Sequence, residues 1–196
     1  MKNLKRIYEE KFKQAVLKSD PFDLEKIVHP YQILVSFFDA GNIQSHLIVL
    51  KELYKNATRK GSLKKEPHSI MYNHKLFSEL LNATWVIYKT KVKRKDIPFH
   101  MADVVMPGGA LSNCTLQKYL MDDEISNPYL GFYHCYKDFS LSCYQRNLYH
   151  WFWFASSTKD FLGKDKDTKK IYRNFYKILI CSWSIYKMEL LNENKS

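Results

Sequence analysis

Two side chains in the second half of the chain have the types and spacing for acid–base chemistry on a phosphate. Arg146 and His150 lie four residues apart, so a helix would place them on one face, one turn apart. A histidine with a pKa of about 6.5 exchanges a proton near neutral pH, and an arginine beside it can hold a phosphate. This pair is therefore the candidate catalytic constellation of the chain.

The Arg146 and His150 pair resembles the arginine–histidine signature of the HEPN ribonucleases, which are small all-α proteins often formed from paired helical bundles. In that signature the arginine and histidine lie further apart than they do here. The resemblance implies an RNA-processing enzyme that uses Arg146 and His150. Because the spacing differs, this stays the alternative hypothesis. No Ser-His-Asp order, glycine-rich nucleotide loop or pair of carboxylates indicates another enzyme class.

Basic side chains form a second candidate site. The chain has 31 Lys plus Arg against 20 Asp plus Glu, a net charge of +11. Residues 1–98 carry +9 (19 basic, 10 acidic), whereas residues 99–196 carry +2 (12 basic, 10 acidic). Cations on one face bind phosphate backbones by releasing counterions, without selecting a sequence. An acidic protein is the alternative partner. The predicted nucleic-acid-binding residues are Arg59, Lys60, Lys64, Lys65, Lys91, Lys93, Arg94 and Lys95.

Aromatic side chains are concentrated in residues 129–154, which hold eleven of them. Helical periodicity over this region predicts a buried stripe of Leu141, Tyr144, Leu148, Phe152 and Ala155. Trp153 and Phe154 would then point mostly away from the core. A helix that is apolar on every side has to be covered on every side, by the chain itself or by another molecule. We therefore predict a partner or ligand surface formed by Tyr149, Trp153 and Phe154.

The remaining composition excludes several classes of protein. The four cysteines form no Cys-x-x-Cys pair, which predicts free thiols and neither a disulfide framework nor a metal site. No cofactor is expected. No stretch has the roughly 18 apolar residues of a membrane span, and the first ten residues are charged where a signal peptide would be apolar. We therefore predict a cytoplasmic protein that does not contact a membrane.

The chain also matches itself at an offset of 98 residues. Residues 85–89 (Trp-Val-Ile-Tyr-Lys) fall on residues 183–187 (Trp-Ser-Ile-Tyr-Lys), and His29-Pro30-Tyr31 falls on Asn127-Pro128-Tyr129. Two separate blocks that share one offset predict an internal duplication. Residues 1–98 would form a basic first repeat and residues 99–196 an aromatic-rich second repeat, packed as one compact unit about a pseudo-two-fold axis. Shared aromatic positions would then belong to the core, and function to positions that differ.

Spacing of apolar residues predicts an all-α fold of about eight helices, because few windows alternate as a strand would. A loop over 91–112 joins the repeats. Lys89 and Lys187 are each expected near a helix C-terminus, where the helix dipole favours a cation. The acidic run 122–124 is expected at a helix end, in solvent. The predicted helices span residues 3–18, 31–40, 43–60, 70–90, 113–122, 129–139, 141–157 and 169–191.

Together, these observations predict a non-enzymatic binding or regulatory protein. It would contact nucleic acid or a protein partner through the basic residues and the aromatic surface.

Overall fold

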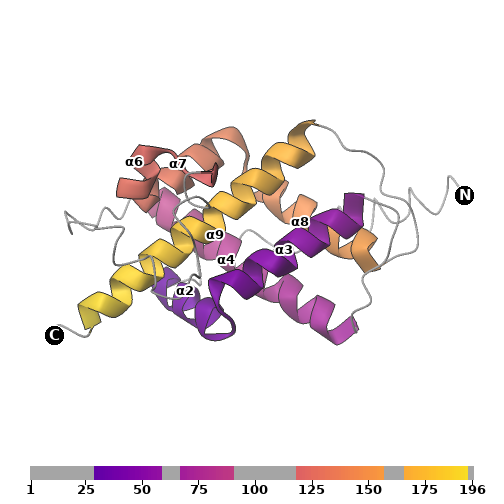
Figure 1. Cartoon of the computed structure of the whole chain (residues 1–196), viewed down its shortest axis with the longest axis horizontal. Helices are drawn as coiled ribbons and strands as arrows, with labels where there is room; N and C mark the ends of the chain where they lie inside the picture. Colours follow the sequence, from indigo (N-terminus) through magenta and orange to yellow (C-terminus); the bar gives the residue numbers. More distant parts are fainter. Residues whose placement is uncertain (1–28, 59–66, 91–117, 157–165, 194–196) are drawn as a thin grey trace, which may run out of the picture.

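The structure is a computed structural model that describes residues 29–58, 67–90, 118–156 and 166–193. Every regular element within these residues is an α-helix, which confirms the predicted all-α class. The predicted helix 3–18 and the joining loop 91–112 lie outside the described residues. The helices labelled in Figure 1 are α2 (Pro30–Asp39), α3 (Ile43–Thr58), α4 (Pro67–Thr90), α6 (Asp122–Ser126), α7 (Pro128–Asp138), α8 (Leu141–Ser156) and α9 (Lys166–Glu193).

Local sequence signals set where these helices begin. Pro30 and Pro128 are the first residues of α2 and α7, where a missing backbone N–H has no helical partner to lose. Asn127 caps α7 through a 3.2 Å hydrogen bond from a first-turn N–H, and Asn42 caps α3 in the same way at 2.9 Å. Because such signals are local, the bounds of these helices follow the sequence prediction to within a few residues.

The predicted helix 113–122 is wrong at its C-terminal end. Residues 118 and 119 are helical, but the chain leaves the helix at Leu120, and α6 begins at Asp122. The Glu124 carboxylate accepts the backbone N–H of Met121 (2.8 Å), which closes a capping box and starts the new helix. The acidic run therefore opens a helix, where the dipole favours negative charge, and Glu124 is fully buried rather than in solvent.

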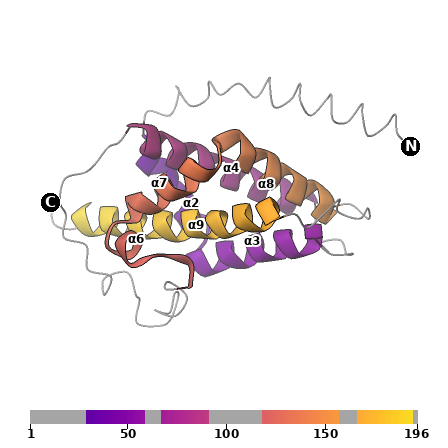
Figure 2. The ribbon, with the colours of Figure 1, turned by 90° about the horizontal axis from the view of Figure 1, so that it is seen from above.

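The core lies where the long helices cross. α9 contacts α2, α3, α7 and α8, while α4 contacts α2, α7 and α8. Figure 2 shows α9 running through the length of the molecule, with α3 on one side and α4 and α8 on the other. The rings of Phe77 on α4 and Phe175 on α9 are fully buried with centroids 6.0 Å apart. Large aromatic side chains thus fill the space between helices.

The crossing of α7 and α9 depends on a glycine. A Cβ added at Gly131 would overlap the Sγ atom of Cys181, which is fully buried on α9. Opposite this cysteine, only a residue without a side chain lets the two helices approach this closely. The backbone of Gly131 is ordinary helix, so the glycine is needed for packing and not for its backbone conformation.

No single described helix is long and apolar enough to cross a membrane. α2 and α3 together reach that length and composition, but they are bent by 87°.

Candidate functional site

All eight basic residues predicted to bind nucleic acid lie outside the described residues: Arg59, Lys60, Lys64, Lys65, Lys91, Lys93, Arg94 and Lys95. The described helices nevertheless show where these runs attach. The first run follows the end of α3 at Thr58, and the second follows the end of α4 at Thr90. The structure around the C-terminal end of α4 therefore adjoins the Lys91–Lys95 run.

Side chains of α4 and α7 form a basic and aromatic surface at this end of α4. The Nζ atom of Lys89 lies 4.6 Å from the ring centroid of Trp85 and 5.5 Å from that of Tyr88. The Tyr88 ring is 6.4 Å from the ring of Tyr133, and Lys137 Nζ lies 5.9 Å from the Tyr133 centroid. We call these five residues the α4–α7 face. Tyr133 is 46% exposed, both lysines are exposed, and the α4 rings are half-buried.

Tyr136 holds α4 and α7 together beneath this face. Its hydroxyl donates to the carbonyl oxygen of Leu81 (3.1 Å) and also shares a 2.7 Å hydrogen bond with the hydroxyl of Thr84. Burial raises the pKa of the Tyr136 hydroxyl far above its usual value, so the group stays protonated and available as a donor. Its ring contacts Trp85 and Tyr88 at centroid distances of 5.0 and 5.4 Å, which fixes both rings.

The α4–α7 face carries a net positive charge. α4 and α7 contain one carboxylate each. Glu79 on α4 lies 3.8 Å from a lysine one turn earlier, and Asp138 on α7 lies 2.9 Å from Lys170. Lys89 and Lys137 form no ion pair with any residue that the structure describes. Among the described residues, no carboxylate therefore competes with a phosphate or another anion for these two cations.

A similar arrangement of a lysine over aromatic rings lies between α2 and α9, but there the rings are buried. Lys187 Nζ lies 4.7 Å from the Trp183 centroid, much as Lys89 lies over Trp85. Here, however, the Tyr186 hydroxyl donates to the Asp39 carboxylate (3.2 Å). Trp183 and Tyr186 are only 6% and 8% exposed, which confirms their predicted core position. Trp85 and Tyr88, the corresponding rings of α4, are half-buried, so the predicted core position holds only in part for them.

The predicted explanation for Lys187 is wrong. α9 continues to Glu193, so Lys187 lies before the last turn and beyond the reach of the C-terminal dipole. Its position over the Trp183 ring indicates a cation–π contact instead. Lys89 has both interactions, since α4 ends one residue later at Thr90.

The predicted aromatic surface on α8 is partly exposed. Tyr149 and Trp153 are 36% and 45% exposed, and their rings stack with centroids 6.4 Å apart. Phe154 packs partly against the core, whereas Trp151, which the predicted buried stripe omitted, is fully buried. His74 on α4 lies beside Tyr149 at 6.2 Å. Burial lowers the pKa of His74, which favours its neutral form among these rings.

Arg146 and His150 both lie on α8, one turn apart, as the spacing predicted. Arg146 is exposed, and its guanidinium lies 3.9 Å from the Sγ atom of Cys143. The half-buried His150 ring lies 6.2 Å from Tyr149 and 6.3 Å from Phe154. The histidine is thus bordered by two aromatic rings.

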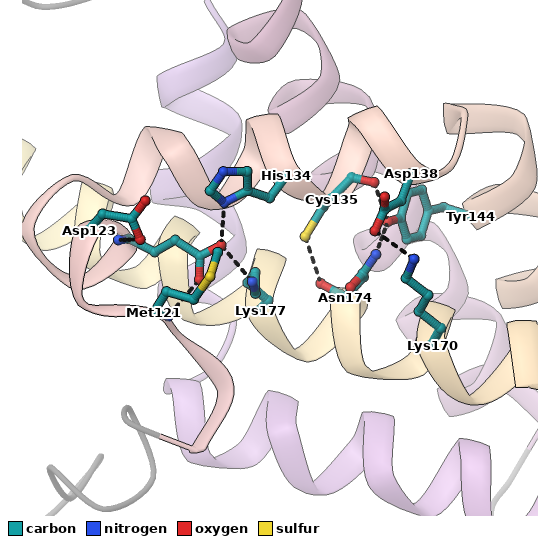
Figure 3. Close-up of polar contacts among 10 residues, drawn as sticks. Met121, Asp123, His134, Cys135, Asp138, Tyr144, Lys170, Asn174 and Lys177 are labelled. Atoms are coloured by element: carbon teal, nitrogen blue, oxygen red, sulfur yellow. Dashed lines mark hydrogen bonds and ion pairs between the residues drawn. The ribbon is translucent and has the colours of Figure 1, made fainter.

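A buried polar cluster joins α6, α7 and α9 (Figure 3). The Glu124 carboxylate contacts Nδ1 of His134 (2.8 Å) and Nζ of Lys177, in addition to the Met121 N–H. One buried carboxylate therefore connects one side chain each from α7 and α9. Glu124 has no exposed surface, so it acts on packing rather than on a ligand.

Two buried cysteines, Cys135 and Cys181, are unsuited to thiol chemistry. The Cys135 Sγ lies 3.5 Å from the carbonyl oxygen of Asn174, so it faces away from the adjacent His134 (Figure 3). The Tyr144 hydroxyl donates to the Cys135 carbonyl oxygen (2.8 Å). Burial raises the pKa of both Cys135 and Cys181, which keeps these thiols protonated and unreactive. Within the described ranges, no three His, Cys, Asp or Glu side chains form a group that could hold a metal ion.

Sequence reasoning missed Tyr133 and Lys137. Their signal is the spacing of four residues on one helix, and at an offset of 98 their counterparts are Val35 and Asp39. This difference replaces an apolar and an acidic residue with an aromatic and a basic one.

Comparisons of the chain with protein-family models, with curated proteins and with solved structures found no match.

Proposed function

We propose that this chain is a non-enzymatic, internally duplicated helical protein that binds nucleic acid and acts as a regulator through that contact. The α4–α7 face and the adjoining basic runs would make the contact. The observation that carries the proposal is the pairing of exposed lysines with aromatic rings where α4 passes into the Lys91–Lys95 run.

Ring contacts repeated at the 98-residue offset support the duplication. A two-fold axis requires that a contact from the first half to the second reappear as a contact from the second half to the first. Two pairs of ring contacts meet this requirement. In the first pair, an α2–α9 contact is equivalent to an α7–α4 contact. In the second pair, an α4–α8 contact is equivalent to an α9–α3 contact. The equivalent pairs are Phe38–Trp183 (5.1 Å) with Tyr136–Trp85 (5.0 Å), and His74–Phe152 (5.2 Å) with Tyr172–Tyr54 (4.1 Å).

Two further observations support the same axis. Phe77 and Phe175 occupy equivalent positions and contact each other, as residues on a two-fold axis must. His46 Nε2 lies 3.0 Å from the carbonyl oxygen of Phe37, and the Tyr144 hydroxyl donates to the carbonyl at the equivalent position of the second half. Different side chains thus satisfy the same backbone group in each half, which is typical of diverged copies.

Charge and exposure favour nucleic acid as the partner. The first half carries most of the net charge of +11, and its basic runs border α4. Clustered cations bind a phosphate backbone through counterion release, which requires no pocket.

The absence of disulfides among Cys135, Cys143 and Cys181 fits the reducing compartment in which we place the protein, the cytoplasm.

Fluorescence anisotropy with labelled DNA and RNA of mixed sequence, both single-stranded and duplex, tests the proposal. We expect binding at low salt that weakens at least tenfold between about 50 and about 200 mM salt. Changing Lys91, Lys93, Arg94 and Lys95 to glutamate should abolish it. No binding of any of these nucleic acids at low salt overturns the proposal.

A matched variant controls for net charge. Lys51, Lys55, Lys169 and Arg173 are exposed on α3 and α9, which contribute nothing to the α4–α7 face. Changing these four residues to glutamate alters the net charge by the same amount as the first variant. We expect it to retain most of the binding, because position rather than total charge determines the contact. Equal loss in both variants contradicts a localised face.

A further inference from the structure

The α4–α7 face and its α2–α9 counterpart differ in the features that decide what can bind. Each has a lysine over a tryptophan ring, so that contact belongs to the common architecture. Only the α4–α7 face adds an exposed tyrosine, Tyr133, and a second lysine, Lys137. In the counterpart, Asp39 accepts the Tyr186 hydroxyl and both α9 rings are buried.

We propose that the α4–α7 face selects unpaired nucleotides, with Tyr133 as the stacking residue and Lys89 and Lys137 holding the flanking phosphates. This inference rests on the proposed function and specifies its substrate class as single-stranded nucleic acid. The α2–α9 face does not take part, because its rings are covered and its carboxylate repels phosphate.

Base stacking is the physical reason for the selection. In a duplex each base already stacks on its neighbours, so an aromatic side chain reaches a base face only where the strand is unpaired. Tyr133 is nearly half exposed and lies 6.4 Å from Tyr88, so its ring borders a second aromatic surface rather than an isolated position. Stacking is tolerant of base identity, because every base has a flat π face, and this fits a site without sequence-reading groups.

Electrostatics place the strand across the two helices. Lys89 lies over the α4 rings and Lys137 over Tyr133, so one cation flanks the aromatic surface on each helix. The α7 carboxylate, Asp138, is already held by Lys170 at 2.9 Å, so it does not compete for these cations. A backbone crossing the face would therefore meet positive charge on both sides of the stacked base.

The decisive measurement is competition between unlabelled single strands and duplexes of equal length, with the full chain and its variants. We expect the native chain to bind single strands at least tenfold more tightly than duplex. Tyr133→Val, which installs the residue found at the equivalent position 35, should weaken single-strand binding far more than duplex binding and so remove that preference. Tyr133→Phe keeps the ring and should keep the preference.

The lysines give a separate readout. Lys137→Asp, which introduces the side chain that Asp39 carries at the equivalent position, should weaken single-strand binding and lower its salt dependence by about one phosphate contact. Lys187→Asp makes the same charge change on the α2–α9 face and should have little effect. Circular dichroism confirms that each variant is folded.

The outcomes separate this inference from the proposed function. Equal binding of both forms, or a preference unaffected by Tyr133→Val, overturns the inference and leaves the proposed function standing. Failure of the native chain to bind either form overturns both.

Discussion

Replacing Gly131 by alanine should destabilise this protein, and the same replacement should stabilise it once Cys181 is also alanine. The reason is the close approach of α7 to α9. A Cβ at position 131 would overlap Cys181 Sγ, but it would lie 3.6 Å from Cys181 Cβ, which is ordinary van der Waals contact. The sulfur atom alone therefore decides whether the methyl group fits.

The expected magnitudes follow from opposing terms. Alanine is favoured over glycine inside a helix by about 1 kcal/mol. Overpacking a buried contact costs about 1–3 kcal/mol, so Gly131→Ala should lower the free energy of unfolding by up to about 2 kcal/mol when the sulfur cannot move aside. Cys181→Ala alone should cost about 1 kcal/mol through the space it leaves. In the double variant the new methyl group occupies that space, so Gly131→Ala should there raise stability by about 1 kcal/mol.

Urea unfolding followed by far-ultraviolet circular dichroism measures all four proteins of this double-mutant cycle. We expect a coupling free energy of roughly 1–3 kcal/mol, with a change of sign for Gly131→Ala between the two backgrounds. The residues 98 positions earlier in the sequence are Ile33 and Ala83, so a side chain at the first position occurs there together with alanine at the second, as in the double variant. An equal cost of Gly131→Ala in both backgrounds would refute the reasoning.

Three further predictions concern the buried polar groups and the alternative site. Glu124→Gln should cost roughly 2–3 kcal/mol in urea unfolding, because Lys177 and His134 lose the carboxylate they share; an unchanged midpoint would show that the cluster is dispensable. Burial lowers the pKa of His46 below 6.5, so on acidification the unfolded chain binds a proton at this histidine before the folded chain does. Stability should therefore fall as pH drops below about 6.5, and His46→Gln should reduce that fall; an identical pH profile would exclude His46 as its source. Finally, the native protein should leave RNA intact, and His150→Ala should bind RNA normally; RNA turnover that is lost in His150→Ala would favour the ribonuclease alternative.

The helices of this protein follow from its sequence because their signals are local. Apolar spacing, the prolines at positions 30 and 128 and the polar caps before α3 and α7 act within a turn or two. The start of α6 was the exception. Its capping carboxylate, Glu124, is held inside by Lys177, a residue more than fifty positions away. The charge run alone carried no sign of that partner.

The candidate site was predictable only in part for the same reason. Composition located the excess of positive charge near α4, and the sequence match at an offset of 98 identified aromatic residues that recur. The sequence alone could not show that Tyr133 on α7 lies beside Tyr88 on α4. Nor could it show that Trp183 is buried whereas Trp85, 98 residues earlier, is half-buried. Helical periodicity states which side of a helix is apolar, but only the packing of one helix on another decides which of those side chains remain in contact with water.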